Sequence, residues 1–206
     1  MRLVNKKFEL DKNEKYLKAV FGDESHFGDG IYKYKIGEIN EASFWNPDDP
    51  VNTYGFNFSN ESNIARWIVR GDTLYDVIIP DDSEVIAINN PSTPNGVFRS
   101  NKIIIINPRP ITDDLALELY KKSSMPEKTY FKTIAGYCVR GHINAAKQIV
   151  KDKVNIENID LAIEEFNDFF KPKPGTPKKP GSTDAHIAHE EILKMLMEIK
   201  AKKENG

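Results

Sequence analysis

YGFNFSNESNIARWIVRG (residues 54–71) is the stretch around which the rest of the chain is organised. Its start alternates as a short strand, and the polar residues that follow, Ser59 or Asn60, are suited to cap a helix. Three large apolar residues then recur at spacings of three and one, as on one face of a helix: Ile64, Trp67 and Ile68. Gly71 follows them, and a glycine adopts a left-handed helix cap without side-chain strain. The pattern predicts a strand and then a helix that ends at Gly71.

Three further strand-like runs complete the central region. They are TLYDVII (73–79), EVIAI (84–88) and KIIII (102–106). β-branched residues favour strands, and turn-forming residues separate the runs. The loop 89–101 carries two prolines and a glycine, and we expect it to be exposed and mobile.

The segment before this region supplies another strand and a long loop. GIYKYKI (residues 30–36) alternates as a strand whose tyrosine face is the natural core side, which leaves Lys33 and Lys35 on the opposite surface. The loop after it contains Phe44 and Trp45, and a connection of this length often carries a binding function. The two aromatic residues are equally suited to seal one end of a sheet.

Near the start of the chain, Asp11 has the position of an N-cap for a short helix that reaches Val20. The next loop, GDESHFGDG (residues 22–30), contains a histidine and several carboxylates. Its spacing matches neither an EF-hand loop nor a zinc pair, so we expect no metal there.

From residue 112 the chain changes to helical patterns. Thr112 is a suitable N-cap for a first helix, with two aspartates at the positive end of the helix dipole. Apolar stripes indicate three more helices before residue 171. KPKPGTPKKPGST (residues 171–183) is a proline-, glycine- and lysine-rich linker, and residues 184–206 return to an amphipathic helix. Such a helix on a linker is typical of an element that docks on a protein partner.

These patterns predict an α+β protein with an antiparallel-rich sheet, a helical cluster and a tethered C-terminal helix. One domain is expected over residues 1–170, with the sheet at about 30–106 and the helices at about 112–170; the linker 171–183 and the helix 184–206 follow. The chain has 206 residues, enough for one sizeable core.

Charge and cysteine content limit the function classes. The net charge of −2 gives no global argument for binding nucleic acid or an anionic membrane. The single cysteine, Cys138, excludes an internal disulfide and suits a reducing compartment. The longest apolar run, residues 103–106, is too short to cross a bilayer, and residues 1–20 contain no signal-peptide core. We therefore expect a cytoplasmic protein without a membrane span.

The order strand, long loop, GFNFS strand, helix, strand, turn, strand, loop, strand resembles the core of the ADP-ribosyltransferase fold over about residues 30–106. It is also similar to uncharacterised bacterial and phage domains with a G-F-x-F strand. The resemblance implies a split sheet, with NAD as the candidate cofactor in the cleft between the 30–36 strand and the GFNFS strand. Carried over to this chain, it implies these ligand-binding residues: Tyr32, Lys33, Lys35, Trp45, Phe56 and Ser59.

Two departures from that family affect its chemistry. No Glu or Asp lies between Asn89 and Asn107, where the family has its catalytic glutamate, and a lysine stands where the family grips NAD with Arg or His. Losing a carboxylate that balances transition-state charge costs orders of magnitude in rate. Asp81 and Glu84 are the nearest substitutes, one strand too early.

The expected function is therefore a non-catalytic or weakly catalytic module that binds a nucleotide-type ligand or a protein partner. One alternative is an active NAD-dependent ADP-ribosyltransferase that uses an unusual acid. Another is a nucleic-acid-binding protein, which is less favoured because acidic residues are interspersed among the basic ones.

Overall fold

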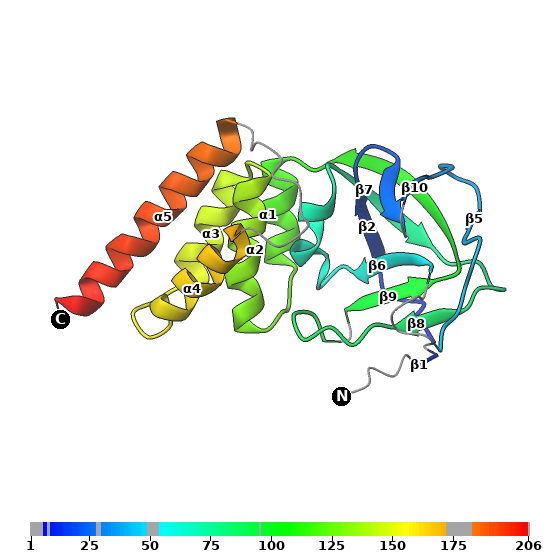
Figure 1. The fold of residues 1–206 in the computed structure, drawn as a ribbon, viewed down its shortest axis with the longest axis horizontal. Coiled ribbons are helices and arrows are strands. Elements are labelled where there is room, and N and C mark those ends of the chain that lie inside the picture. Colours follow the sequence, from blue (N-terminus) through cyan, green and yellow to red (C-terminus); the bar gives the residue numbers. More distant parts are fainter. Residues whose placement is uncertain are drawn as a thin grey trace. The chain divides into compact units, whose positions relative to one another are not determined.

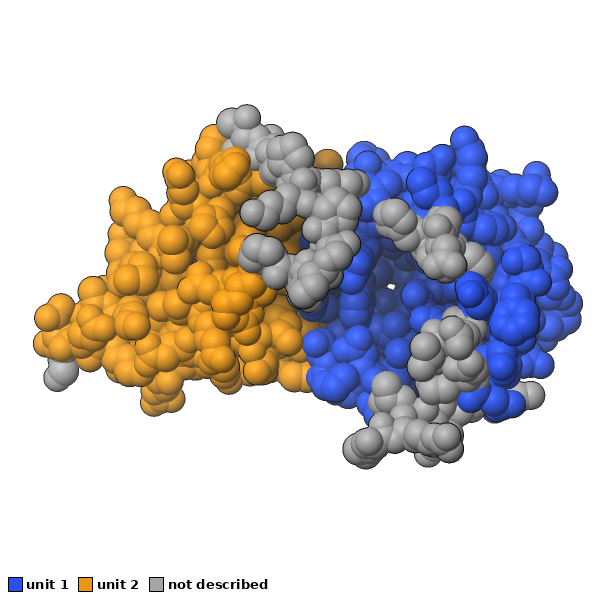
Figure 2. Space-filling model, in the orientation of Figure 1, with its two compact units in different colours: residues 1–111 blue, residues 112–206 orange. Residues whose placement is uncertain are grey.

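The computed structural model describes residues 6–7, 9–27, 30–48, 54–94, 96–171 and 183–205. The chain divides into two compact units, residues 1–111 and 112–206, which Figure 2 colours separately. The first unit contains the strands and the second contains the α-helices (Figure 1). The predicted α+β class is confirmed. The boundary between the units lies at residues 111 and 112, within the single domain that was expected over residues 1–170.

In the described part of the first unit, eight strands form one sheet in the order β1–β8–β9–β6–β2–β7–β10–β5 (Figure 1). Neighbouring strands pair antiparallel. The strands are β1 (Lys6–Lys7), β2 (Tyr16–Val20), β5 (Asn40–Glu41), β6 (Phe56–Asn60), β7 (Thr73–Ile78), β8 (Val85–Ala87), β9 (Val97–Ser100) and β10 (Lys102–Pro110).

The sheet curls on itself because β9 leads directly into β10. Three strands lie between these two in the sheet order, which in a flat sheet would put them about 19 Å apart. Ser100 and Lys102 are two residues apart in the chain and so within about 7 Å of each other. The Ser100 hydroxyl donates to the backbone oxygen of Lys102 at 2.8 Å. One end of the sheet is therefore drawn together around its core.

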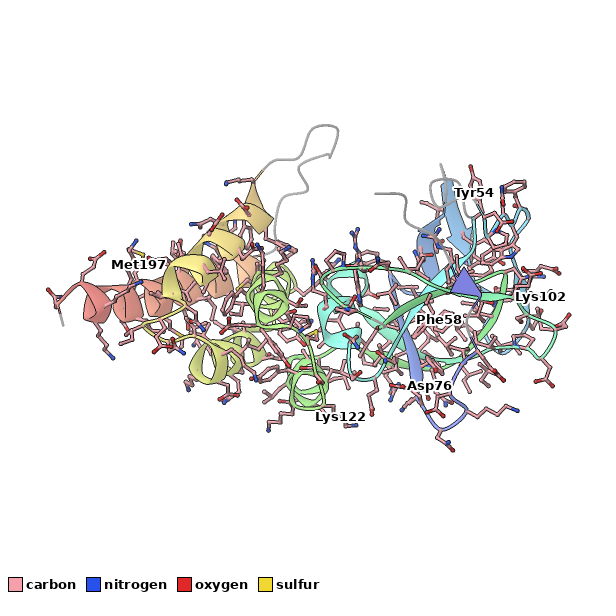
Figure 3. All side chains as sticks on the ribbon, turned by 90° about the horizontal axis from the view of Figure 1, so that it is seen from below. Tyr54, Phe58, Asp76, Lys102, Lys122 and Met197 are labelled. Carbon is pink, nitrogen blue, oxygen red and sulfur yellow. The ribbon has the colours of Figure 1, made fainter. Side chains whose placement is uncertain are left out.

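The core enclosed by the sheet is rich in aromatic residues. The ring of Tyr16 meets the rings of Phe58 and Phe98 edge-on, each with centroids 5.6 Å apart, and Phe58 is labelled in Figure 3. The other buried members are Val20, Tyr34, Phe56, Tyr75, Val77, Val85, Ile103 and Ile105. Large rings contribute most of the apolar area that such a small core buries.

A separate hairpin, β3 (Glu24–Phe27) and β4 (Gly30–Lys33), packs beside this core. The strand predicted over 30–36 thus ends at Lys33, and Ile36 is 47% exposed rather than in the core. The root of the hairpin is tied to β7, because the Tyr75 hydroxyl donates to the Gly22 oxygen at 2.9 Å.

The helix predicted after the GFNFS strand is wrong. β6 continues through Ser59 and Asn60, and two short 3-10 turns follow, η1 (Ile64–Arg66) and η2 (Ile68–Arg70). Ser59 and Asn60 are paired strand residues, so neither caps a helix in the way that the sequence pattern predicts. Gly71 ends η2 but is extended, with φ −162°, so it is not the left-handed cap that was predicted. A glycine is required there because a Cβ would lie 2.3 Å from the backbone of Val20.

Two other predictions near the sheet are corrected. The segment predicted as a helix from Asp11 to Val20 contains strand β2, which lies in the middle of the sheet and is buried on both faces. Burial on both faces hides the alternation by which a strand is recognised. The loop expected over 89–101 contains strand β9, in which Val97, Phe98 and Ser100 are buried.

The second unit is a cluster of helices: α1 (Asp113–Lys121), α2 (Glu127–Val139), α3 (Ile143–Lys153), α4 (Ile159–Phe170) and α5 (Thr183–Glu204). The Thr112 cap is confirmed, since its hydroxyl accepts from the Leu115 amide at 3.2 Å.

The tethered helix of the prediction is instead an integral part of this unit. α5 packs on α2, α3 and α4 (Figure 1). Ala188, Ile192 and Leu196 on that face are fully buried. The predicted linker lies outside the described residues, apart from Lys171 and Thr183 at its ends. The apolar stripe expected to meet a partner is therefore largely covered within the chain itself.

Candidate functional site

Two of the predicted ligand-binding residues meet in the core. The ring of Tyr32 contacts that of Phe56, with centroids 4.9 Å apart, and Tyr34 adds a third ring 5.6 Å from Phe56. The Tyr32 hydroxyl donates to the Asn40 side chain at 3.3 Å. These aromatic rings fill the space in which the resemblance would place a ligand.

The two predicted lysines lie on the surface. The side chain of Lys33 is 71% exposed and its ammonium lies 3.6 Å from the Asp23 carboxylate. Lys35 is exposed, and its backbone amide donates to the side-chain oxygen of Asn40 at 2.8 Å. Neither lysine is shown in contact with the three rings.

Of the remaining predicted residues, Trp45 and Glu84 contact each other. The Trp45 indole donates to the Glu84 carboxylate at 3.0 Å, and its ring lies so close to Gly55 that a Cβ there would come within 2.5 Å. Asp81 is exposed. Ser59 is buried, and its hydroxyl donates to the Gly96 oxygen. Trp45 thus seals part of the sheet, as one of the two interpretations of its loop predicts.

A lysine that the sequence patterns did not single out lies beside the aromatic rings. Lys18 occupies the centre of β2, between the core residues Tyr16 and Val20, and is only 7% exposed. Its ammonium lies 5.4 Å from the centroid of the Tyr34 ring and donates a hydrogen bond to the backbone oxygen of Asn57. The available signal was a lysine in the middle of an otherwise apolar run, Tyr16-Leu17-Lys18-Ala19-Val20.

The position of Lys18 coincides with an opening in the sheet. β2 and β6 pair only through Tyr16 with Asn60 and Leu17 with Ser59, whereas β2 continues to pair with β7 as far as Val20. The Asn57 carbonyl lies beyond the last of the β2–β6 pairs. The Lys18 amine gives this backbone oxygen a hydrogen-bond partner where the ladder has ended.

The electrostatic surroundings of Lys18 are unusual for a buried lysine. In the part of the chain that the structure describes, Lys18 forms no ion pair with a carboxylate. Burial, together with the smaller effect of the nearby positive charge of Arg99, lowers the pKa of Lys18 to about 7. Lysines are almost never fully buried unless they are paired.

Arg99 also contacts Asn57, from the neighbouring strand β9. It lies on β9, directly across from Asn57 on β6, and its Nε donates to the Asn57 side-chain oxygen at 2.7 Å. Burial also lowers the pKa of Arg99. The Tyr34 hydroxyl is engaged with the Ser25 hydroxyl at 2.9 Å, and burial raises the pKa of the Tyr34 phenol. Lys18, Arg99, Asn57 and Tyr34 form the cluster that we call the Lys18 site.

Other polar features of the first unit offer less. A hollow of about 510 Å³ is lined by residues 9–14 with Tyr16, Asn60 and Phe98, but its rim carries more acidic than basic residues. Asp76 is held by Arg109 at 2.6 Å and Asn107 at 2.9 Å, so its charge is already balanced. Among the described residues, no group of three His, Cys, Asp or Glu is arranged to hold a metal ion.

No family model, curated protein or solved structure matches the chain. Of the helices that the structure describes, none has both the length and the apolar character that a bilayer span requires.

Proposed function

We propose that residues 1–111 form a non-catalytic or weakly catalytic binding module that takes a nucleotide-type, phosphate-bearing ligand at the Lys18 site. The observation that carries this proposal is the buried Lys18 ammonium with no carboxylate partner among the described residues. An unpaired buried charge is costly, and a bound anion offsets that cost. A phosphate between Lys18 and Arg99 would accept hydrogen bonds from the ammonium of one and the planar guanidinium of the other.

A degenerate ADP-ribosyltransferase-like core is part of this proposal. Its support is that β6, which carries the GFNFS sequence, is the strand at which the pairing with β2 ends early. NAD is accordingly one of the nucleotides to test. The lack of catalysis is supported by the two candidate acids, since Glu84 binds the Trp45 indole and Asp81 is exposed. An oxocarbenium-like transition state would need a carboxylate at the ligand.

Thermal unfolding with ligands tests the proposal. NAD and ADP are each added to the full chain, with adenosine as the matched compound that lacks phosphate. A ligand at 100 times its Kd stabilises the native state by about 2.7 kcal/mol, which raises Tm by several degrees in a unit of this size. We expect a shift with a phosphate-bearing nucleotide and little with adenosine.

Variants locate the binding site. Lys18→Met and Arg99→Gln should each abolish most of the shift, whereas Lys33→Met, which removes an exposed lysine paired with Asp23, should leave it unchanged. The proposal is wrong if no nucleotide shifts Tm, or if the shift survives in both Lys18→Met and Arg99→Gln.

A further inference from the structure

The Lys18 amine has the surroundings of a nucleophile as well as those of an anion-binding cation. We propose that Lys18 is a covalent attachment site that forms an imine with an aldehyde or ketone bearing an acidic group, which Arg99 holds. This inference shares Lys18 with the proposed nucleotide site but needs no nucleotide, so each can fail without the other.

The geometry around the amine supports this reactivity. Lys18 is 7% exposed. Among the described residues its ammonium forms no ion pair with a carboxylate, and its hydrogen-bond partner is a neutral backbone oxygen. Arg99 is the charged neighbour that affects it. Lysine nucleophiles are activated in this way, by desolvation and by a second cation nearby. With a pKa of about 7, close to half of the Lys18 amine is neutral at pH 7.

Imine formation at Lys18 requires only the amine and the carbonyl compound. The neutral amine nitrogen attacks the carbonyl carbon, a carbon–nitrogen bond forms, and the carbonyl oxygen leaves as water with the two amine hydrogens. No oxidant or reductant is required. The imine formed in this step is neutral, and once it takes up a proton from water its positive charge would lie near the Tyr34 ring, where the ammonium now lies at 5.4 Å from the ring centroid.

Access to the amine depends on the β3–β4 hairpin. Tyr34, which directly follows β4, covers Lys18 with its ring, and its hydroxyl is held by Ser25 on β3. In the described residues the two hairpin strands pair with each other and with no strand of the large sheet. The hairpin and the residue that follows it contact the core through side chains, such as the rings of Tyr32 and Tyr34 against Phe56. Movement of this hairpin would expose the amine without breaking the sheet.

The test uses glyoxylate, a small aldehyde with a carboxylate, on the full chain at pH 7 with cyanoborohydride to trap the imine as a stable amine. Peptide mass spectrometry then measures the labelled fraction of each lysine. An ordinary lysine amine is neutral to less than about one part in a thousand at pH 7. We expect Lys18 to be labelled at least roughly tenfold faster than the exposed Lys33 in the same sample, a margin that allows for slower access.

Three further measurements sharpen the result. The peptide that contains residue 18 should carry no label in Lys18→Met. Arg99→Gln should slow labelling of Lys18 by glyoxylate more than it slows labelling by neutral acetaldehyde. Tyr34→Phe, which keeps the ring but removes its bond to Ser25, should speed labelling. If Lys18→Met fails to fold, the labelled fractions of Lys18 and Lys33 in the parent protein still test the proposal. Label spread over exposed lysines, with Lys18 no faster than Lys33, overturns the proposal.

Discussion

The two units of this protein bury charge in opposite ways. In the helical unit, Glu165 on α4 is 5% exposed and is paired with two lysines of α2, Lys128 and, at 3.4 Å, Lys132. In the sheet unit, Lys18 is 7% exposed and has a carbonyl oxygen and an aromatic ring in place of a carboxylate. The same chain therefore compensates a buried acid and leaves a buried base poorly compensated. The second arrangement leaves a buried positive charge without a counterion, which costs stability, and for this reason we propose a functional role for Lys18.

The largest expected effect is the loss of a buried side chain from the interior of the helical unit, and Leu196 is the residue that tests it. Leu196 on α5 is fully buried, so Leu196→Ala should destabilise the protein by roughly 2–5 kcal/mol. Met197 on the same helix is 50% exposed and is labelled in Figure 3. Met197→Ala is the matched control and should change stability little. Equal urea midpoints for both variants would mean that α5 does not pack on the unit.

The pH dependence of stability tests the other side of the comparison. Burial lowers the pKa of Lys18 to about 7, below its ordinary value, so between these two values the unfolded chain binds more protons than the folded one. Stability contributed by this group therefore rises with pH from about 7 upward. Between pH 7 and pH 9 the gain should be on the order of 2 kcal/mol.

Urea unfolding at both pH values measures this gain as a difference between the parent protein and Lys18→Met. The variant cancels contributions from the other titrating groups. A parent that gains no stability over Lys18→Met between pH 7 and pH 9 would show that Lys18 titrates as an exposed lysine does.

Much of the helical unit could be predicted from the sequence, whereas the site could not. Thr112 and the stripes on α1 to α4 are local signals of capping and spacing, and local signals suffice for helices. Lys18 was missed for a physical reason. β2 is buried on both faces, so its sequence does not alternate, and the partner of the lysine, Asn57, lies 39 residues away. Only the register of β2 and β6 brings the two together.

The candidate ligand residues illustrate the same limit. Tyr32 and Phe56 do meet, because both belong to the aromatic core. Trp45 and Glu84 also meet, but as an indole–carboxylate pair that no motif announces. Sequence patterns thus located an apolar neighbourhood correctly, while the polar chemistry within it depends on long-range pairing.

A smaller effect is expected from unpairing Glu165. The double variant Lys128→Met with Lys132→Met leaves the buried carboxylate without its cations, and should lower Tm. The loss is moderated because both lysines are partly exposed, which lets water approach. Adding Glu165→Gln to the double variant removes the stranded charge and should restore much of the Tm. If the triple variant melts no higher than the double variant, the pairing is not what stabilises Glu165.

The smallest expected effect concerns His142, a buried base of the helical unit. It precedes α3, is 6% exposed, and packs edge-on against the Tyr137 ring at 5.9 Å. Burial lowers the pKa of His142, the Asp113 carboxylate raises it, and Arg140 lowers it, for a net decrease. Because the folded pKa lies below the ordinary one near 6.5, the stability from neutral His142 is complete above pH 6.5 and declines as pH falls below it.

The acid-side measurement compares the parent with His142→Gln, which is polar and of similar size but does not titrate. The parent should lose slightly more stability than the variant between pH 7 and pH 5. The difference should be smaller than that for Lys18, because Asp113 supplies the nearby carboxylate that the Lys18 site lacks. Asp113→Asn should enlarge the acid-induced loss by removing that compensation. An Asp113→Asn variant with an unchanged or smaller acid-induced loss would contradict the assignment, and with it the view that a neighbouring carboxylate is what separates the two buried bases.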